Sequence, residues 1–136
     1  MSAANQPLSL LERNKQLVIR WFEEVWNHSN RNTIFELLHE NGILHDGAQN
    51  FRGPHEFTAF HDDLRAQFDN FHITPLVVLA EDDLVCCHWS ADMRHKASGK
   101  PLHITGTSVV RIEGSRFVEA WQNWDAAGLQ TQLATQ

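Results

Sequence analysis

Apolar residues in the first half of the chain recur at intervals of three and four, the spacing of helices with one buried face. Ser9 and Glu12 form a capping box that predicts the start of the first helix. Its apolar positions are Leu11, Val18, Trp21, Phe22, Val25 and Trp26. A second helix is expected from Asn32 to Asn41–Gly42, where the glycine favours a left-handed cap. A third begins at Gly53–Pro54, and its apolar stripe is Phe57, Phe60, Leu64 and Phe68.

The hydrophobic period changes in the second half of the chain. Runs with strand character cover residues 71–80, 84–95, 102–113 and 117–125, and the residues between them are turn-formers of hairpin length. A shorter strand is expected over Ile43–Asp46. Helices followed by a meander of strands are typical of an α+β fold, in which helices cover one face of an antiparallel sheet. We predict a single domain over residues 1–136, with an ordered core from about residue 9 to residue 130.

The last predicted strand has two unlike faces. Glu119, Trp121, Asn123 and Asp125 share one face, and Val118, Ala120, Gln122 and Trp124 share the other. Polar groups beside indole rings suit an apolar pocket with a few convergent polar atoms. A carboxylate in such a pocket has a raised pKa, which suits acid–base chemistry, and Asp125 is the leading candidate. The alternative is that Asp125 caps the turn into residues 126–128 and that Glu119 pairs with a cation at the rim.

The neighbours of Arg111 depend on the hairpin between the last two strands. A two-residue loop pairs Arg111 with Val118. A three-residue loop with a bulge pairs it with Phe117 instead and brings His103 opposite Asp125. The residues alone leave both registers open.

Composition narrows the classes of partner. Eleven Lys and Arg residues against 17 Asp and Glu residues give a net charge of −6, which opposes binding to nucleic acid or to an anionic membrane surface. The longest apolar run, Leu76–Ala80, is far shorter than the ~20 residues of a membrane span, and the first residues do not resemble a secretory signal. Cys86 and Cys87 are adjacent and are expected to be buried, unpaired thiols, so we predict a cytoplasmic protein.

Other chemistries lack the residue spacing that they need. The nine histidines include no pair two, three or four residues apart, the spacings at which one strand or helix presents two metal ligands. The sequence also lacks a nucleophile elbow, a phosphate loop and a dinucleotide fingerprint. We therefore expect neither a metal nor a cofactor. His45–Asp46, at the end of the short strand, is a second place for acid–base chemistry, although a surface turn also explains this pair.

An ordered set of motifs over roughly residues 14–134 resembles the SnoaL-like polyketide cyclase family, within the nuclear-transport-factor-like superfamily. The motifs are Asn14–Trp26, Leu44–Asp46 before Arg52–Pro54, Glu81–Asp83 before Leu84, Gly99–Pro101 before a strand with Gly106 and Arg111, then Val118–Glu119, Trp121 and Asp125, and Gly128–Leu133. The resemblance implies a cone-shaped α+β barrel, in which a bent sheet wraps a long helix and leaves an apolar cavity open at one end. It also implies a homodimer formed through the outer face of the sheet.

The same resemblance implies roles for particular residues. Characterised cyclases of the family close polyketide esters by a cofactor-free intramolecular aldol reaction, with an aspartate near the end of the last strand as acid and base. Asp125 matches that position. Related isomerases use an aspartate just after the helical region as base, and Asp46 matches that place. Their tyrosine donor has no counterpart, because this chain has no tyrosine. His103 or His45 is the expected histidine partner.

Three readings follow. As an enzyme, the protein would use Asp125 to take a proton from the carbon beside a carbonyl, while a donor such as His103 or Asn123 stabilises the enolate. As a binding protein, it would hold a small hydrophobic molecule in the same cavity without chemistry. In the third reading, internal hydrogen bonds satisfy the polar groups, and the protein serves a structural role as a dimer without binding a ligand. The residues expected to line the pocket are Trp21, Trp26, Phe60, Trp89, Arg111, Glu119, Trp121, Asn123 and Trp124.

Overall fold

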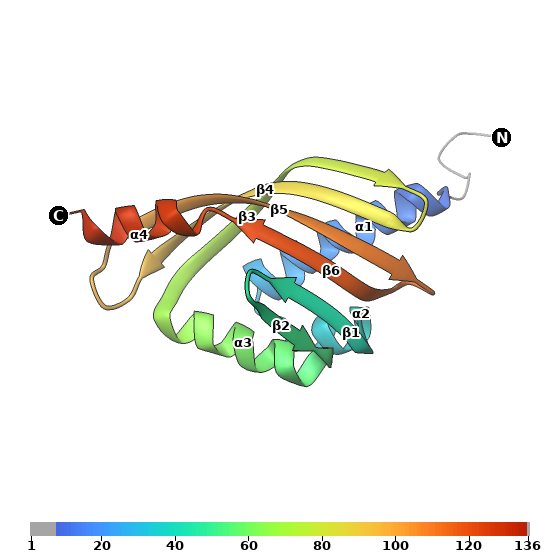
Figure 1. Cartoon of the computed structure of the whole chain (residues 1–136), viewed down its shortest axis with the longest axis horizontal. Coiled ribbons are helices and arrows are strands. Elements are labelled where there is room, and N and C mark those ends of the chain that lie inside the picture. Colours follow the sequence, from blue (N-terminus) through green and yellow to red (C-terminus); the bar gives the residue numbers. More distant parts are fainter. Residues whose placement is uncertain (1–7, 136) are drawn as a thin grey trace.

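The computed structural model describes residues 8–135 and places the helices against one face of a curved, six-stranded sheet (Figure 1). The strands are β1 (Leu38–Asp46), β2 (Gln49–Arg52), β3 (Phe68–Glu81), β4 (Leu84–His95), β5 (Pro101–Glu113) and β6 (Arg116–Trp124). Their spatial order is β2-β1-β6-β5-β4-β3, in which β1 and β6 are parallel and all other neighbours are antiparallel. The α+β class and the bent sheet agree with the sequence-based expectation.

The sheet is open and does not close into a barrel. Strands β2 and β3 form its two edges, and helix α3 (Gly53–Gln67) contacts both of these strands as well as β1. The helix therefore occupies the side on which the two edges would have to meet. The concave face of the sheet is turned toward α3 (Figure 1).

The remaining helices agree with the predicted caps in part. Helix α1 (Leu10–Trp21) begins at the predicted capping box, where the Ser9 hydroxyl accepts the N–H of Glu12 at 3.1 Å. It continues into a π-helical segment, η2 (Phe22–Asn27), and is followed by α2 (Arg31–Leu37) and, at the end of the chain, by α4 (Ala126–Ala134). Helix α1 packs against β3 and β4, so its apolar face forms the main core with the sheet.

Side chains of α3 hold the end of η2 in place. The Val25 carbonyl accepts a hydrogen bond from His61 Nε2 at 2.9 Å, and the Trp26 carbonyl accepts one from the Arg65 guanidinium. A π-helical segment changes the direction of the side chains that follow it, and such segments are frequent at functional sites. Here the segment directs Trp26 toward the space under the sheet.

The predicted end of the second helix is wrong. Helix α2 ends at Leu37, and Gly42 lies within β1. A Cβ atom at Gly42 would lie 2.7 Å from the Phe117 carbonyl oxygen and 2.9 Å from a methyl carbon of Leu38. The β1–β6 ladder also shifts its register between Leu38 and Ile43. Glycine is therefore needed there for the close approach of two strands and not for a helix cap.

Two short elements are absent from the sequence-based prediction. Strand β2 has only Phe51 as a large apolar residue, so its pattern is indistinguishable from a loop. Helix α4 extends to Ala134, beyond the expected end of the core, and buries Leu129. In addition, Phe68 opens β3 and does not close the stripe of the third helix.

The two cysteines differ in their surroundings. Both are unpaired; Cys87 is buried, while Cys86 is partly exposed, which corrects the expectation that both are buried. Burial raises the pKa of the Cys87 thiol to about 11. Over the described range 8–135, no helix has the length and apolar character of a membrane span.

The buried ring of His61 makes the stability of the fold depend on pH. Because Nε2 donates to a carbonyl, Nδ1 carries a lone pair, and this atom has no hydrogen-bond partner within residues 8–135. Burial lowers the pKa of His61. As the pH falls below the value of about 6.5 for an unfolded histidine, the unfolded chain binds a proton that the folded chain does not. The free energy of unfolding should then fall by up to about 1.4 kcal/mol per pH unit.

Urea unfolding of the wild type and of His61→Gln at several values between pH 7.5 and 5.5 checks this prediction. Glutamine can still donate to the Val25 carbonyl but does not titrate, so the variant should lose this part of the slope. His72→Gln, at an exposed position, should keep it. Equal slopes in all three proteins would contradict the assignment to His61.

Candidate functional site

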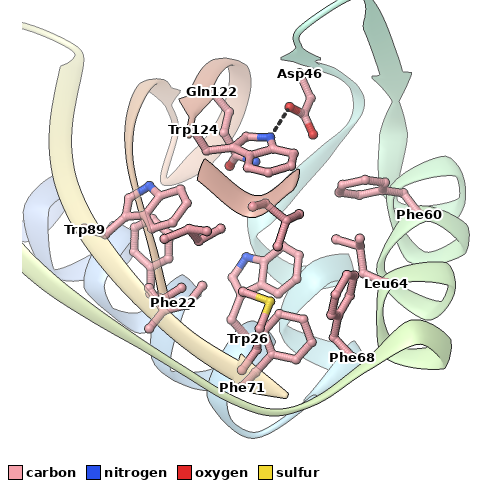
Figure 2. Close-up of a pocket in the computed structure, with 15 residues that line it drawn as sticks. Phe22, Trp26, Asp46, Phe60, Leu64, Phe68, Phe71, Trp89, Gln122 and Trp124 are labelled. Atoms are coloured by element: carbon pink, nitrogen blue, oxygen red, sulfur yellow. Dashed lines mark hydrogen bonds between the residues drawn. The ribbon is translucent and has the colours of Figure 1, made fainter. Parts of the chain in front are cut away.

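An apolar cavity of about 90 Å³ lies between the concave face of the sheet and the helices (Figure 2). It is lined by Phe22, Trp26, Asp46, Phe60, Leu64, Phe68, Phe71, Ile73, Trp89, Ala91, Met93, Ile104, Gln122, Trp124 and Leu129. These residues come from η2, α3, α4 and five of the strands, which the fold brings together around one space. Four of the predicted lining residues, Trp26, Phe60, Trp89 and Trp124, lie here.

Asp46 provides the carboxylate of this cavity. It is the last residue of β1 and pairs in the parallel ladder with Gln122 of β6. The indole N–H of Trp124 donates to Asp46 Oδ1 at 3.0 Å, and Oδ2 accepts no hydrogen bond from any group within residues 8–135 (Figure 2). Burial raises the pKa of Asp46, and the Trp124 hydrogen bond opposes this shift. A carboxylate with one free oxygen and a raised pKa is suited to accept and return a proton.

A chain of hydrogen bonds orients the amide of Gln122. The buried Trp89 indole donates to Ser108 Oγ at 3.0 Å, and Ser108 Oγ donates to Gln122 Oε1 at 3.4 Å. The amide nitrogen of Gln122 donates to no group in the described part of the chain and is available to a ligand. Gly106 makes room for this arrangement, because a Cβ there would lie 2.4 Å from the Trp89 ring.

A second, smaller space of about 40 Å³ adjoins the cavity and shares Phe22, Asp46, Phe60 and Gln122 with it. Its remaining lining includes Trp21, which packs between Phe57 and Phe117, together with His45 and Glu119. Asp46 and Gln122 therefore lie where the two spaces meet. A ligand that spans both spaces would have its middle beside these two polar groups.

His45 lies on the opposite face of β1 from Asp46, within a hydrogen-bonded network. Its Nε2 lies 2.8 Å from Glu119 Oε2 and its Nδ1 lies 2.8 Å from Asn50 Oδ1. The Glu119 carboxylate also accepts from the Arg111 guanidinium. These contacts raise the pKa of His45, mainly through Glu119, and lower the pKa of Glu119, mainly through His45. The pairing satisfies His45 away from Asp46, so the adjacent pair does not act on one ligand.

Trp121 and Asn123 lie on the outer face of the sheet. The ring of Trp121 stacks on His45, with centroids 5.7 Å apart, and 37% of Trp121 is exposed. Asn123 is exposed as well. The alternation of the last strand is therefore as predicted, but the face that carries Gln122 and Trp124 is the one that lines the cavity.

Asp125 lies outside the cavity and caps α4. Its Oδ1 accepts the backbone N–H of Gly128 at 2.9 Å, and the side chain is exposed. This geometry is the capping alternative of the sequence analysis. His103 is also exposed and bonds to Asp92 at 2.8 Å, so it does not meet Asp125. Neither residue contributes to the lining of the two spaces described above.

The observed hairpin differs from both predicted registers. Glu113 pairs with Arg116 across a two-residue turn, but a bulge then shifts the ladder so that Arg111 pairs with Glu119. A bulge adds one residue to one strand and leaves it unpaired. Arg111 consequently belongs to the outer-face network and not to the cavity.

Sequence reasoning missed Gln122 and Ser108 as site residues. Gln122 stands between Ala120 and Trp124 on a face that is otherwise apolar, and this isolated polar residue was the available indication. Ser108 similarly interrupts the buried positions of β5. Within residues 8–135, no group of three or more His, Cys, Asp or Glu side chains is placed to hold a metal ion.

The fold and the cavity define a class of α+β proteins that enclose a small apolar site beneath a curved sheet. Residues 16–133 match the family model of the SnoaL-like polyketide cyclases, and the chain belongs to this family. No curated protein sequence matches the chain.

Solved structures show the same fold. IdmH, a proposed polyketide cyclase of Streptomyces antibioticus, superposes with a TM-score of 0.81 at 19% identity, over 90% of this chain and 99% of that chain. A proposed SnoaL-like polyketide cyclase of Jannaschia sp. CCS1 superposes with a TM-score of 0.86 at 17% identity, over 97% of this chain and 99% of the other.

Replacing the cavity carboxylate should stabilise the protein at neutral pH. The pKa of Asp46 is raised in the folded state. Ionised Asp46 therefore reduces the stability of the fold at pH values above the pKa of an unfolded aspartate, which is about 3.9. Asp46→Asn keeps an acceptor for the Trp124 indole and removes the charge. Each unit of raised pKa corresponds to about 1.4 kcal/mol of added stability in the variant.

Chemical denaturation at pH 7.5 and at pH 3.5 measures this effect. The gain should be present at pH 7.5 and should shrink at pH 3.5. Asp63→Asn, at an exposed position of α3, is the matched control and should change stability at neither pH. A loss of stability in Asp46→Asn at pH 7.5 would show that the carboxylate is not under strain from burial.

Proposed function

We propose that the protein catalyses cofactor-free acid–base chemistry on a small hydrophobic carbonyl compound, with Asp46 as the base. The observation that carries this proposal is the free oxygen of Asp46 in an aromatic cavity, next to the unused amide N–H groups of Gln122. Membership of the SnoaL-like polyketide cyclase family supports it. Asp46 takes the role that the sequence analysis gave to Asp125.

The proton is transferred within the cavity. The Asp46 carboxylate removes a proton from the carbon beside a carbonyl and becomes a carboxylic acid, while the carbonyl becomes an enolate. The amide nitrogen of Gln122 donates a hydrogen bond to the enolate oxygen, and the apolar walls strengthen this interaction by excluding water. Asp46 then returns the proton to a different carbon of a conjugated enolate, or the α-carbon of the enolate attacks a second carbonyl, whose alkoxide receives the proton from Asp46.

Trp89 and Ser108 position the donor. Because Ser108 Oγ donates to Gln122 Oε1, the amide cannot turn its oxygen toward the ligand without losing that bond. The Trp89 indole in turn keeps the Ser108 hydroxyl directed toward Gln122 by occupying its acceptor side. Both residues act through Gln122 and need not touch the ligand.

Hydrogen–deuterium exchange at carbon tests the assignment of the base. Aromatic ketones and methyl esters with acidic α-hydrogens are incubated with the protein in D₂O, and incorporation is followed by NMR. The wild type should accelerate exchange of at least one compound over buffer, and Asp46→Asn should lose about 100-fold or more of that acceleration. Gln122→Leu should lose a similar factor, because an oxyanion donor of this kind contributes about 10²–10³.

Asp125→Asn is the matched control, because asparagine also caps helices and the variant removes only the carboxylate. It should exchange at the wild-type rate. Loss of exchange in Asp125→Asn with retention in Asp46→Asn would return the role to Asp125. Saturable quenching of tryptophan fluorescence without exchange of any compound would favour a binding protein that performs no chemistry.

We also propose that the protein forms a homodimer through the outer face of the sheet. Leu79, Cys86, Val109 and Trp121 are successive partners across β3, β4, β5 and β6 and form one row on that face. Leu79 is 62% exposed, and the exposed Val77 lies beside this row. Exposed apolar surface of this kind is typical of protein interfaces.

Analytical ultracentrifugation of Leu79→Glu tests the dimer. The new carboxylate would be buried in the interface, so the Leu79→Glu variant should sediment as a monomer where the wild type sediments as a dimer. Ile19→Glu, at an exposed apolar position of α1, should leave the mass unchanged. A wild-type protein that sediments as a monomer at all concentrations would refute the proposal.

A further inference from the structure

In the described part of the chain, the cavity combines aromatic walls with a negative charge and no positive one. Three indole rings and four phenyl rings line it, and Asp46 is the one titratable residue among the described lining residues. No lysine, arginine or histidine of residues 8–135 contributes to this lining. The faces of aromatic rings carry partial negative charge, so both the walls and the carboxylate attract a cation.

The carboxylate is placed to act as a counter-ion. Only Oδ1 is occupied, by the Trp124 indole N–H, so Oδ2 can face a ligand. In the close-up, Asp46 lies at one end of the cavity, with the ring of Phe60 on one side and that of Trp124 on the other (Figure 2). A cation beside Oδ2 would therefore be close to aromatic rings and to a negative charge at once.

We propose that the cavity binds a hydrophobic tertiary or quaternary ammonium compound, with Asp46 as the counter-ion and the surrounding indole and phenyl rings as the cage. Recognition of alkylated ammonium groups by aromatic cages is a known use of cation–π attraction. Alkyl groups on the nitrogen also suit the apolar walls, which offer few hydrogen-bond acceptors to a primary ammonium group. The net charge of −6 favours the approach of cations to the protein.

This inference goes beyond the proposed function, because it concerns which ligands enter the cavity and requires no proton transfer. It shares only the cavity and Asp46 with that proposal. It also predicts that anions are excluded, since a bound carboxylate or phosphate would face Asp46 with no cationic side chain among the described lining residues.

Other charges near the site are already paired. The side chains of His45 and Glu119, next to the adjoining space, lie on the outer face of β1 and β6 and bond to each other at 2.8 Å. Arg65 lies with its guanidinium carbon 4.5 Å from the centroid of Phe71, so it occupies one face of that ring from outside the lining. The rings nearest Asp46 in the close-up, those of Trp124 and Phe60, have no such partner within the described chain.

A pair of ligands that differ only in charge tests the inference. Benzyltrimethylammonium and neopentylbenzene have the same shape, because one nitrogen of the first replaces a carbon of the second. Binding is followed by tryptophan fluorescence at pH 7.5, with phenylacetate as an anionic probe. The wild type should bind the cation at least tenfold more tightly than the neutral compound and should not bind phenylacetate measurably.

Two variants assign the preference to its causes. Asp46→Asn should reduce the ratio of cation to neutral affinity at least tenfold, while its binding of neopentylbenzene shows that the cavity is intact. Phe60→Leu should weaken cation binding more than neutral binding. Lowering the pH through the raised pKa of Asp46 should weaken binding of the cation and leave that of neopentylbenzene unchanged.

Tighter binding of neopentylbenzene than of the cation by the wild type would overturn the inference, and so would an unchanged ratio in Asp46→Asn. Carbon-exchange activity is measured separately and does not depend on either result. Exchange on neutral ketones without cation preference would leave the proposed function standing and remove only the ammonium ligand.

Discussion

The parallel pairing of β1 with β6 is the contact on which the site depends. It joins the strand that leaves the helical region to the last strand of the sheet, and it aligns Asp46 with Gln122. The hydrogen bond from Trp124 to Asp46 joins the last residue of β6 to the last residue of β1. A carboxylate at a strand end would ordinarily be solvated. Here the rings of Phe60 from α3 and Trp124 from β6 flank it (Figure 2), and burial raises its pKa.

The N-terminal helices supply the opposite wall through an irregularity in helical geometry. The carbonyl groups at the end of η2 are satisfied by His61 and Arg65 from α3. The amide of Asn27 bonds to both backbone groups of Ile73, at 2.7 and 3.1 Å, and so joins the same segment to β3. These bonds hold Trp26 under the sheet, where its ring packs against Phe57 and Phe71. On this wall of the cavity, the backbone polar groups at the end of η2 are thus used in bonds to α3, and the Asn27 amide is used in bonds to β3.

Two faces of one sheet have separate chemistry in this protein. On the concave face, the indoles of Trp89 and Trp124 donate to Ser108 and Asp46, so their N–H groups stabilise the site. On the outer face, His45 and Glu119 are hydrogen-bonded partners next to the stacked ring of Trp121. Because neighbouring residues of a strand point to opposite faces, His45 and Asp46 belong to different environments although they are adjacent in sequence.

The sequence by itself determined the α+β class, the positions of most helices and strands, and the family. The Ser9 cap, the apolar stripe through Trp26 and the alternation along the last strand follow from local spacing, which one chain segment carries alone. The sequence did not determine whether Asp46 or Asp125 is the carboxylate of the cavity. Both are aspartates at strand ends, and their environments differ only because of residues far away in the chain.

The tertiary structure decided between the two aspartates through the register of β5 with β6 and the close approach of β1 to β6. The bulge between Arg111 and Ile112 decides which residues of β6 face inward, and Gly42 allows β1 to pack closely on that strand. Neither effect has a local pattern, because a bulge can be accommodated at several positions of a hairpin and a glycine in a strand resembles a glycine in a turn. The identity of the cavity carboxylate was therefore settled by strand pairing and by the burial that results from it.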